Sequence, residues 1–177
     1  MSVIFPEATK AQGNISVTVV ASVADTDAPD LSSEINAAGS VNVSCFLYDN
    51  GSVVNATTNK VTANARLCTT EQFQQFGNTT YEVSDLIYVY DPQASGTADE
   101  NKAKTLLAEG SDVYLVERLG LDAQTTAYAA AQLVNVYHVR LGPQNRTRQG
   151  DAEAAEFSIT QSAILLEPPV YDVAIVA

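Results

Sequence analysis

The sequence predicts an all-β domain, a β-sandwich or β-barrel with one short flanking α-helix, and three observations support this prediction. About eight segments are rich in β-branched and aromatic residues, and several of them alternate between apolar and polar residues. Each segment is short and ends at turn-forming residues, which is typical of sandwiches and barrels. A single segment has helical spacing. The length of 177 residues suits one domain that buries a sizeable core.

The first two expected strands lie in the N-terminal third of the chain. Ile15–Val23 is dominated by β-branched residues, which favour an extended backbone. Val41–Tyr48 alternates at its start, so Val43, Cys45 and Leu47 are expected to lie on the same face as its first residue.

The next two expected strands are Val61–Leu67 and Tyr81–Tyr90. The first alternates throughout, with apolar side chains at odd-numbered positions and polar ones at even-numbered positions. The second begins by alternating and becomes apolar on both faces from Leu86.

One short helix is expected at Thr97–Glu109. Thr97 and Glu100 have the spacing of a capping box, in which each side chain accepts a hydrogen bond from the backbone of the other residue. Acidic residues in the first turn suit the positive end of the helix dipole. Gly110 is placed to end the helix, because glycine readily adopts the left-handed conformation found there.

Four more strands complete the expected fold, each rich in β-branched or aromatic residues. They are Asp112–Leu119, Leu133–Leu141, Glu156–Leu166 and Tyr171–Val176. The stretch Thr125–Gln132 leaves two interpretations open. Its alanines favour a helical turn, whereas its direct continuation into the next strand favours an extended loop.

The chain divides into an N-terminal arm at residues 1–13 and a single β-sandwich or barrel domain at residues 14–177. Two long loops are expected within the domain, at residues 24–39 and 142–155. Connections of this length in a small domain are usually functional or disordered. The first loop contains acidic residues and no basic residue, so we expect it to be exposed.

Charge excludes several classes of partner. The chain has 9 Lys and Arg residues against 21 Asp and Glu residues, a net charge of -12, which disfavours binding to nucleic acid or to an anionic membrane. No apolar run approaches the roughly 20 residues of a membrane-spanning helix, and the N-terminus lacks the pattern of a secretory signal. Without export, Cys45 and Cys68 are expected to be buried free thiols.

No motif in the chain predicts catalysis. The single histidine, His138, lies within an expected strand and is interpreted as structural. With two distant cysteines, the chain has no zinc-binding spacing. The acidic run from Asp25 to Asp30 lacks the glycine and the terminal glutamate of a calcium-binding loop. Neither a nucleophile elbow nor a phosphate-binding loop occurs. We therefore expect no enzymatic activity, no cofactor and no bound metal.

The local basic cluster consists of Arg140, Arg146 and Arg148. Two interpretations remain open: a solvated loop whose charges pair locally with Asp151 and Glu153, or pairing with an acidic surface on another copy of the chain. The second needs both signs of charge on one molecule. The acidic candidates for such inter-subunit contact are Asp25, Asp27 and Asp30.

Several short motifs follow one another between Thr57 and Leu166. They are Arg66-Leu67-Cys68, FGNTTY from Phe76, YVYDPQ from Tyr88, LLAEG from Leu106, YLVER from Tyr114 and VNVYHV from Val134. Their order resembles that of the tail tube (major tail) proteins of bacteriophages with long, non-contractile tails, especially phages of actinobacterial hosts.

The resemblance implies a structural virion protein whose subunits assemble into six-fold rings, and the rings stack into a tail tube. The loops and the N-terminal arm would contact neighbouring rings. Its implied partners are other copies of the chain together with the tape-measure, tail-tip and tail-terminator proteins. DNA would pass through the lumen without specific binding, no membrane would be involved, and assembly would take place in the host cytoplasm.

An acidic lumen would let DNA slide, because negative walls repel phosphate whereas basic patches retain it. Strands that line a lumen should present one polar face, which several expected strands do. The candidate lumen-facing residues are Glu82, Ser84, Glu156, Ser158 and Thr160. An ordinary solvent-facing side of a sheet is the other interpretation of the same pattern.

Two other functions remain open at this point. A monomeric β-sandwich binding or adhesion module would suit the Ser-, Thr- and Asn-rich strands, although the chain lacks Trp and an obvious aromatic platform. The second of these functions is that of another phage or phage-derived tube or decoration protein of similar fold. Self-association separates these functions, because a binding module does not require it.

Overall fold

The computed structural model of the protein describes residues 7–49, 53–68, 70–96, 98–125 and 127–177. Its elements are, in chain order, β1 (Ile15–Val20), η1 (Leu31–Ile35), β2 (Val41–Asn42), β3 (Val54–Thr62), β4 (Gln74–Val83), β5 (Leu86–Val89), η2 (Asp99–Asn101), α1 (Lys102–Leu106), β6 (Asp112–Leu119), β7 (Leu133–Gln149), β8 (Glu156–Leu165) and β9 (Val170–Ala174).

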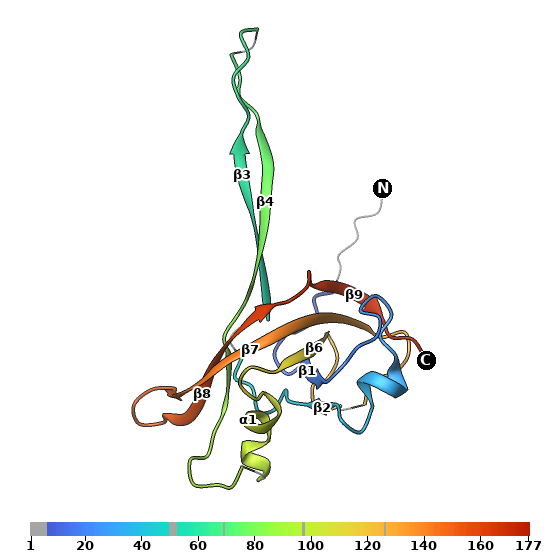
Figure 1. The fold of residues 1–177 in the computed structure, drawn as a ribbon, viewed down its shortest axis with the longest axis vertical. Helices are drawn as coiled ribbons and strands as arrows, with labels where there is room; N and C mark the ends of the chain where they lie inside the picture. Colours follow the sequence, from blue (N-terminus) through green and yellow to red (C-terminus); the bar gives the residue numbers. More distant parts are fainter. Residues whose placement is uncertain (1–6, 50–52, 69, 97, 126) are drawn as a thin grey trace.

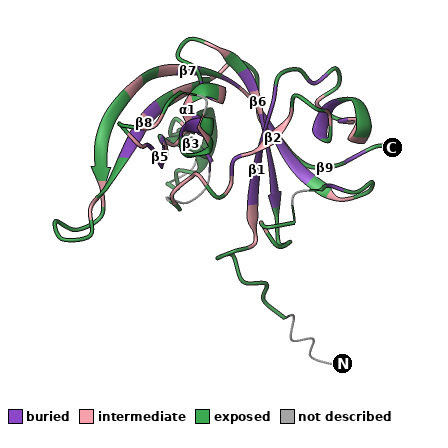
Figure 2. Ribbon diagram, turned by 90° about the horizontal axis from the view of Figure 1, so that it is seen from below, coloured by how far each residue is buried: buried purple, intermediate pink, exposed green. Residues whose placement is uncertain are grey.

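Seven of these strands form one antiparallel sheet in the order β2-β1-β6-β7-β8-β5, and β9 pairs with the start of β7. The sheet curls into a half-barrel (Figure 1). The long strands β7 and β8 arch around α1, as Figure 2 shows from below. The predicted all-β fold with one short helix is confirmed. Among the described residues, the remaining two strands form a separate hairpin and not the second layer of a sandwich.

Both faces of the central strands are buried. On β6, Val113 and Leu115 face a core that also contains Leu107 beside α1. Val116 faces the opposite side and packs in a second core with Ile35 of η1. Because the sheet is covered on both sides, its central strands have few exposed positions, and apolar residues follow one another without strict alternation.

The β3–β4 hairpin projects far from this body, along the longest axis of the molecule (Figure 1). Between its first residue, Val54, and its last, Val83, every strand residue is exposed. A register shift lies between Thr58 and Lys60. Gly77 lies on the partner strand at this shift. A Cβ added to Gly77 would lie 3.0 Å from the side chain of Val61, so this position has little room for a larger residue.

The structure corrects the predicted strands around the hairpin. The predicted strand Val61–Leu67 overlaps the end of β3, which begins seven residues earlier at Val54. The predicted strand Tyr81–Tyr90 is two strands, β4 and β5, separated where the chain leaves the hairpin and enters the sheet. Alternation failed as a guide here because both faces of the hairpin are exposed, so neither face requires apolar residues.

The predicted strand Val41–Tyr48 is also shorter in the structure. Only Val41–Asn42 pairs with β1, and the chain then turns, with the Asn42 side chain accepting hydrogen bonds from the amide and hydroxyl of Ser44. Asparagine side chains commonly stabilise such turns. The turn places Cys45 at the surface, and Cys68 is exposed as well; both are free thiols, so their predicted burial was wrong.

The predicted helix Thr97–Glu109 is shorter in the structure. It consists of one 3₁₀ turn, Asp99–Asn101, followed by α1, and its N-cap residue Ala98 makes no side-chain hydrogen bond. Thr97, the predicted capping residue, lies outside the described residues. The Asn101 side chain instead contacts the backbone of the preceding loop, bonding Asp91 through both its oxygen and its nitrogen.

Both predicted loops contain regular structure. β7 continues to Gln149, so strand covers the first eight residues of the predicted loop 142–155. It was missed because these residues are polar on both faces, and only pairing with β8 reveals the strand. The predicted loop 24–39 contains η1, which buries Glu34. In the open stretch Thr125–Gln132, the described residues form no helix and lead into β7 by a turn.

Candidate functional site

The hairpin has the most exposed apolar side chains in the described part of the chain. Leu67, Phe73 and Phe76 lie at or near its tip with 111%, 66% and 79% of their surface exposed. Val61 and Tyr81 are exposed further along the strands. Two-stranded hairpins are marginally stable in water, and exposed apolar patches usually mark a contact surface. The hairpin therefore has the properties of an element that binds a partner.

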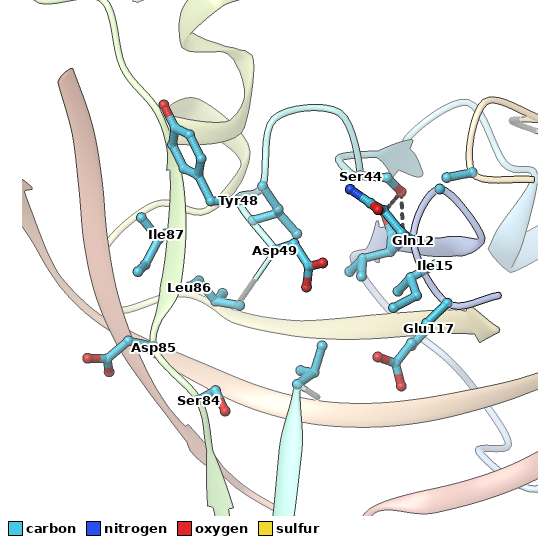
Figure 3. A pocket seen from close by; sticks show the side chains of 16 residues that line it. Gln12, Ile15, Ser44, Tyr48, Asp49, Ser84, Asp85, Leu86, Ile87 and Glu117 are labelled. Carbon is cyan, nitrogen blue, oxygen red and sulfur yellow. Dashed lines mark hydrogen bonds between the residues drawn. The ribbon is translucent and has the colours of Figure 1, made fainter. Parts of the chain in front are cut away.

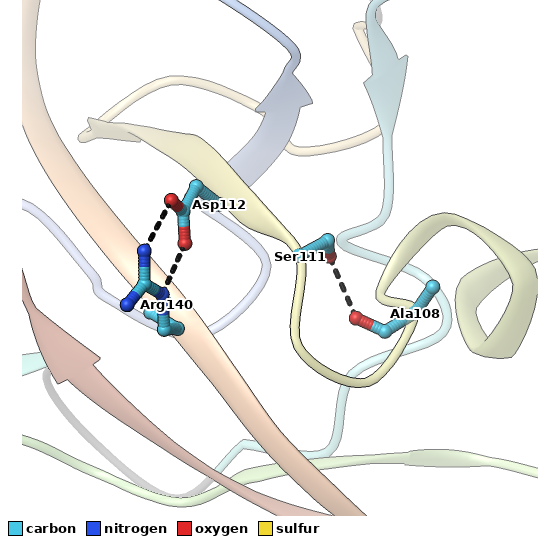
Figure 4. A network of polar contacts seen from close by, with 4 residues as sticks. All are labelled: Ala108, Ser111, Asp112 and Arg140. Atoms are coloured by element: carbon cyan, nitrogen blue, oxygen red, sulfur yellow. Dashed lines mark hydrogen bonds and ion pairs between the residues drawn. The ribbon is translucent and has the colours of Figure 1, made fainter.

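Arg140, one member of the predicted basic cluster, already has a partner within the subunit. Its Nε and Nη2 donate to the two carboxylate oxygens of Asp112 at 2.6 and 2.7 Å, across the β6–β7 pair (Figure 4). The guanidinium lowers the pKa of the Asp112 carboxyl below its usual 3.8. In the preceding turn, Ser111 donates its hydroxyl hydrogen bond to the carbonyl of Ala108. Arg140 is thus committed to this ion pair.

Arg146 and Arg148 differ from Arg140. Both side chains are exposed on the same face of β7, and neither has an ion-pair partner among the described residues. The local pairing with Asp151 and Glu153 that the sequence allowed is not formed. The structure therefore divides the predicted basic cluster into a paired Arg140 and the exposed Arg146 and Arg148.

The side chain of Lys104 is a third cation close to these arginines. The Lys104 Nζ lies 4.9 Å from the centroid of the Tyr90 ring, and the Arg146 guanidinium carbon lies 5.6 Å from the same centroid. Tyr90, Arg146 and Arg148 line a groove of about 260 Å³ together with the half-exposed ring of Phe157. We call Lys104, Arg146, Arg148, Tyr90 and Phe157 the basic patch. Sequence analysis missed Tyr90 and Lys104, because only the curl of β7 around α1 brings them to the arginines.

The predicted acidic residues also divide into two groups. Asp30 caps η1, and its carboxylate accepts hydrogen bonds from the backbone amides and hydroxyls of Ser32 and Ser33. The bond from the Ser33 amide makes the largest contribution to lowering the pKa of Asp30 below 3.8. Asp25 and Asp27 remain exposed, with no ion pair among the described residues. We call residues 24–30 the acidic loop.

The distal part of the β7–β8 pair has one entirely polar face. Glu156, Ser158 and Thr160 lie on it, and Thr147 on β7 donates or accepts hydrogen bonds with both hydroxyls at 3.0 Å. Glu156 is exposed and accepts a hydrogen bond from the hydroxyl of Tyr48. Ser158, however, is 0% exposed, so it lies in the predicted row without reaching the surface.

Glu82 and Ser84, the other two lumen candidates, lie elsewhere. Both are at the base of the hairpin, where Glu82 is opposite Asn55 and the Asn55 amide donates to the Ser84 hydroxyl at 3.1 Å. Glu82 is exposed and Ser84 is half-buried. The structure therefore places the five candidates on two different surfaces.

A cavity of about 230 Å³ opens beside the base of the hairpin (Figure 3). Its lining is mostly apolar and includes the carboxylates of Asp49, Asp85 and Glu117. Glu117 is buried and accepts hydrogen bonds from the Asn135 amide at 2.9 Å and the Tyr137 hydroxyl at 2.7 Å. The described lining includes no histidine, cysteine or lysine.

The remaining polar groups of interest have structural partners. His138 stacks on Tyr114 with ring centroids 4.2 Å apart, and its Nδ1 lies 3.3 Å from a carboxylate oxygen of Glu167. Within the described ranges, no group of three or more His, Cys, Asp or Glu side chains has the arrangement of a metal site. No helix in the same ranges is long and apolar enough to cross a membrane.

Comparison with known proteins identifies the family of this chain and agrees with its exposed contact surfaces. A family model described as phage tail tube protein matches residues 4–177. The chain belongs to the phage tail tube protein family. The match includes the N-terminal third, which the motif order had not covered. A search of curated proteins found no match to this chain.

Membership in the tail tube family confirms several predictions. The protein is a structural component of the virion tail, and the family is non-enzymatic. Tail tube proteins polymerise, so the exposed hairpin belongs to a protein whose partners include its own copies. An origin in a phage of actinobacterial hosts stays a prediction.

Proposed function

We propose that this tail tube subunit assembles into six-fold rings, and that the rings stack into a tube through which the phage genome passes. The observation that carries this proposal is the shape of the subunit. The hairpin projects along the long axis, and the curled sheet extends across it (Figures 1 and 2). A subunit of this shape can make contacts around a ring with its body and contacts between rings with its hairpin.

The hairpin supplies the contact between rings. Its exposed apolar side chains, Leu67, Phe73 and Phe76 among them, lose their contact with water when they pack on a subunit of the adjacent ring. The same contact covers the unpaired strand edges of an isolated hairpin, which would otherwise favour aggregation. Residues 7–13 of the N-terminal arm are also exposed and contribute to stacking.

The lumen is lined by the polar face of β7 and β8. Glu156 and Thr160 provide carboxylate and hydroxyl groups at this face, while Ser158 is buried and is left out of the lining. With a net charge of -12 per subunit, a wall of this kind repels DNA phosphate and does not retain it. Glu82 contributes from the hairpin base as a second acidic position.

Other tail proteins complete the assembly. The tape-measure protein occupies the lumen before the genome does, the tail-tip complex starts the tube, and the tail terminator ends it. DNA passes without specific binding. Assembly takes place in the host cytoplasm. These partners follow from the function proposed for the tube, whose two ends and lumen each require a contact.

Negative-stain electron microscopy of a hairpin variant tests the proposal. The wild-type protein is expected to form hollow tubes at high concentration. The variant Leu67→Ser/Phe73→Ser/Phe76→Ser should form rings without long tubes, and its folded body should remain intact because these side chains lie at the surface. The control Leu133→Ser removes a side chain that is 56% exposed on the body and should leave tubes unchanged.

Two results would contradict the proposal. Long tubes of wild-type stability from the triple variant would exclude the hairpin as the contact between rings. A wild-type protein that stays monomeric with tail-tip and tape-measure proteins present would instead favour a monomeric binding module.

The lumen assignment has its own test in phage particles. Glu82→Gln and Glu156→Gln remove negative charge without changing side-chain size, so tubes should form normally while genome ejection becomes slower. Unchanged infectivity of both variants would contradict the assignment.

A further inference from the structure

The basic patch lies at one lateral end of the subunit, and the acidic loop lies at the other. Arg146 and Arg148 are near the β7–β8 turn, on the left in Figure 1. The acidic loop lies on the right, beside the C-terminus, where Pro29 and Leu31 exchange backbone hydrogen bonds with Val176. Figure 2 shows the same two ends on opposite sides of the body.

The basic patch has three cations and no anion among its described members. Lys104 and Arg146 both contact the ring of Tyr90, which brings two like charges to one aromatic side chain. Arg148 follows on the same face of the strand. Neighbouring like charges repel one another, and none of the three cations forms an ion pair with a carboxylate among the described residues. An approaching carboxylate would relieve this repulsion.

The acidic loop offers such carboxylates. Asp25 and Asp27 are exposed, and their described contacts are local, with the Asp25 carboxylate accepting from the backbone amide of Asp27 at 3.0 Å. Asp30 is excluded because it caps η1, and Arg140 is excluded because it pairs with Asp112. Arg146 and Arg148 at one end of the body, and Asp25 and Asp27 at the other, are therefore exposed charges with no ion pair among the described residues.

We propose that the basic patch of one subunit binds the acidic loop of the neighbouring copy around the ring, through Arg146 and Arg148 on one side and Asp25 and Asp27 on the other. This inference rests on the proposed ring assembly. Head-to-tail contacts between unlike surfaces close into rings, and they require the two surfaces to lie at opposite ends of one subunit. Arginine suits this contact because its planar guanidinium can bind a carboxylate in a bidentate manner.

The contact also has a role in specificity. An arrangement that placed patch against patch or loop against loop would bring like charges face to face. The charges thus disfavour contacts between like surfaces, while the exposed part of the Phe157 ring provides apolar area within the same groove.

Charge reversal on each side tests this pairing with the full-length protein. The patch variant is Arg146→Glu/Arg148→Glu, and the loop variant is Asp25→Lys/Asp27→Lys. Each variant alone should raise the concentration needed for assembly at least about tenfold, since like charges would then meet across every contact. An equimolar mixture should assemble again, because in alternating rings each reversed surface meets a partner of opposite sign.

A control separates pairing from net charge. Asp151→Lys/Glu153→Lys changes the net charge by the same amount as the loop variant, but it does so in the β7–β8 turn beside the basic patch. Under the proposal this control assembles at least as readily as the wild type, because positive charge added beside the patch does not oppose the acidic loop. Sedimentation and electron microscopy measure assembly, and circular dichroism verifies that each variant is folded.

Each outcome has a distinct meaning. The pairing is supported if each single-side variant assembles poorly and the equimolar mixture assembles again. Normal assembly of both single-side variants, failure of the mixture to recover, or failure of the control would overturn it. If the patch variant assembles normally but loses binding of a labelled DNA duplex, the patch is a polyanion site and the pairing is wrong. Failure of the wild type to assemble would count against the proposed function itself.

Discussion

Arg118 allows a quantitative prediction, because its guanidinium is 0% exposed and organises an entire loop. Its Nη1 donates to the carbonyl of Ala127 and the side-chain oxygen of Gln132, both at 3.2 Å. Its Nη2 donates to the carbonyls of Asp122 at 3.2 Å and Thr125 at 2.7 Å. All of these acceptors belong to the connection between β6 and β7. That connection is folded around one buried cation.

The substitution Arg118→Met keeps an unbranched side chain as far as the position of Nε and removes every donor. If one carbonyl stays dry and unpaired, the cost is about 2 kcal/mol. Loss of the contact between the guanidinium and the Tyr128 ring, 4.4 Å from centroid to guanidinium carbon, adds about 2 kcal/mol for a desolvated pair. The expected destabilisation of about 4 kcal/mol corresponds to a drop in Tm of about 8–16 °C for a domain of this size.

Thermal and urea unfolding, followed by circular dichroism, measure this change in the unassembled subunit. The control Arg148→Met makes the same substitution at an exposed side chain without an ion pair, and should alter stability by no more than about 0.5 kcal/mol. If Arg118→Met lowers Tm by less than about 2 °C, water has replaced the guanidinium at no cost. The reasoning about the loop would then be refuted.

Two further predictions concern packing and pH. A Cβ on Gly142 would lie 2.9 Å from the backbone oxygen of Ser162, so Gly142→Ala should destabilise the subunit by about 1–3 kcal/mol. Gly39 has open space around it, so the control Gly39→Ala should raise stability by about 0.4–1 kcal/mol. Equal unfolding curves for the two variants would contradict this prediction. Burial, and then the hydrogen bond to Glu156, raise the pKa of Tyr48 from 10.0 to about 12, which favours its neutral form in the folded state. The stability that Tyr48 contributes is therefore present below pH 10.0 and lost as the pH rises to about 12. The difference in unfolding free energy between wild type and Tyr48→Phe should narrow over that window, and a constant difference would exclude the effect.

The central strands were the most predictable part of the fold. The predicted strand Asp112–Leu119 matches β6 residue for residue, and Glu156–Leu166 matches β8 within one residue. Both are rich in residues that favour an extended backbone, and β6 is buried on both faces, so local preference and burial act in the same direction. The hairpin was predicted least well, because strands that are exposed on both faces have no hydrophobic pattern to reveal them.

The candidate contact residues were predicted in part. The sequence identified Arg146, Arg148, Asp25 and Asp27, but it grouped them with Arg140 and Asp30. Those two form hydrogen bonds within the subunit that depend on strand register and on the cap of η1. Whether a charged side chain is free or already paired is a property of the fold, since its partner can come from any distance along the chain.

The amino-acid sequence by itself determined the all-β class, the single short helix, the acidic surplus and the absence of catalytic motifs, because composition and local pattern are sufficient for each. Motif order also led to the tail tube family. Only the tertiary structure decided that the sheet curls into a half-barrel, that the hairpin projects along the long axis, and that the β7–β8 turn and the acidic loop lie at opposite ends of the body. These features depend on which strands pair and in which register, and contacts between residues far apart in the chain determine that pairing.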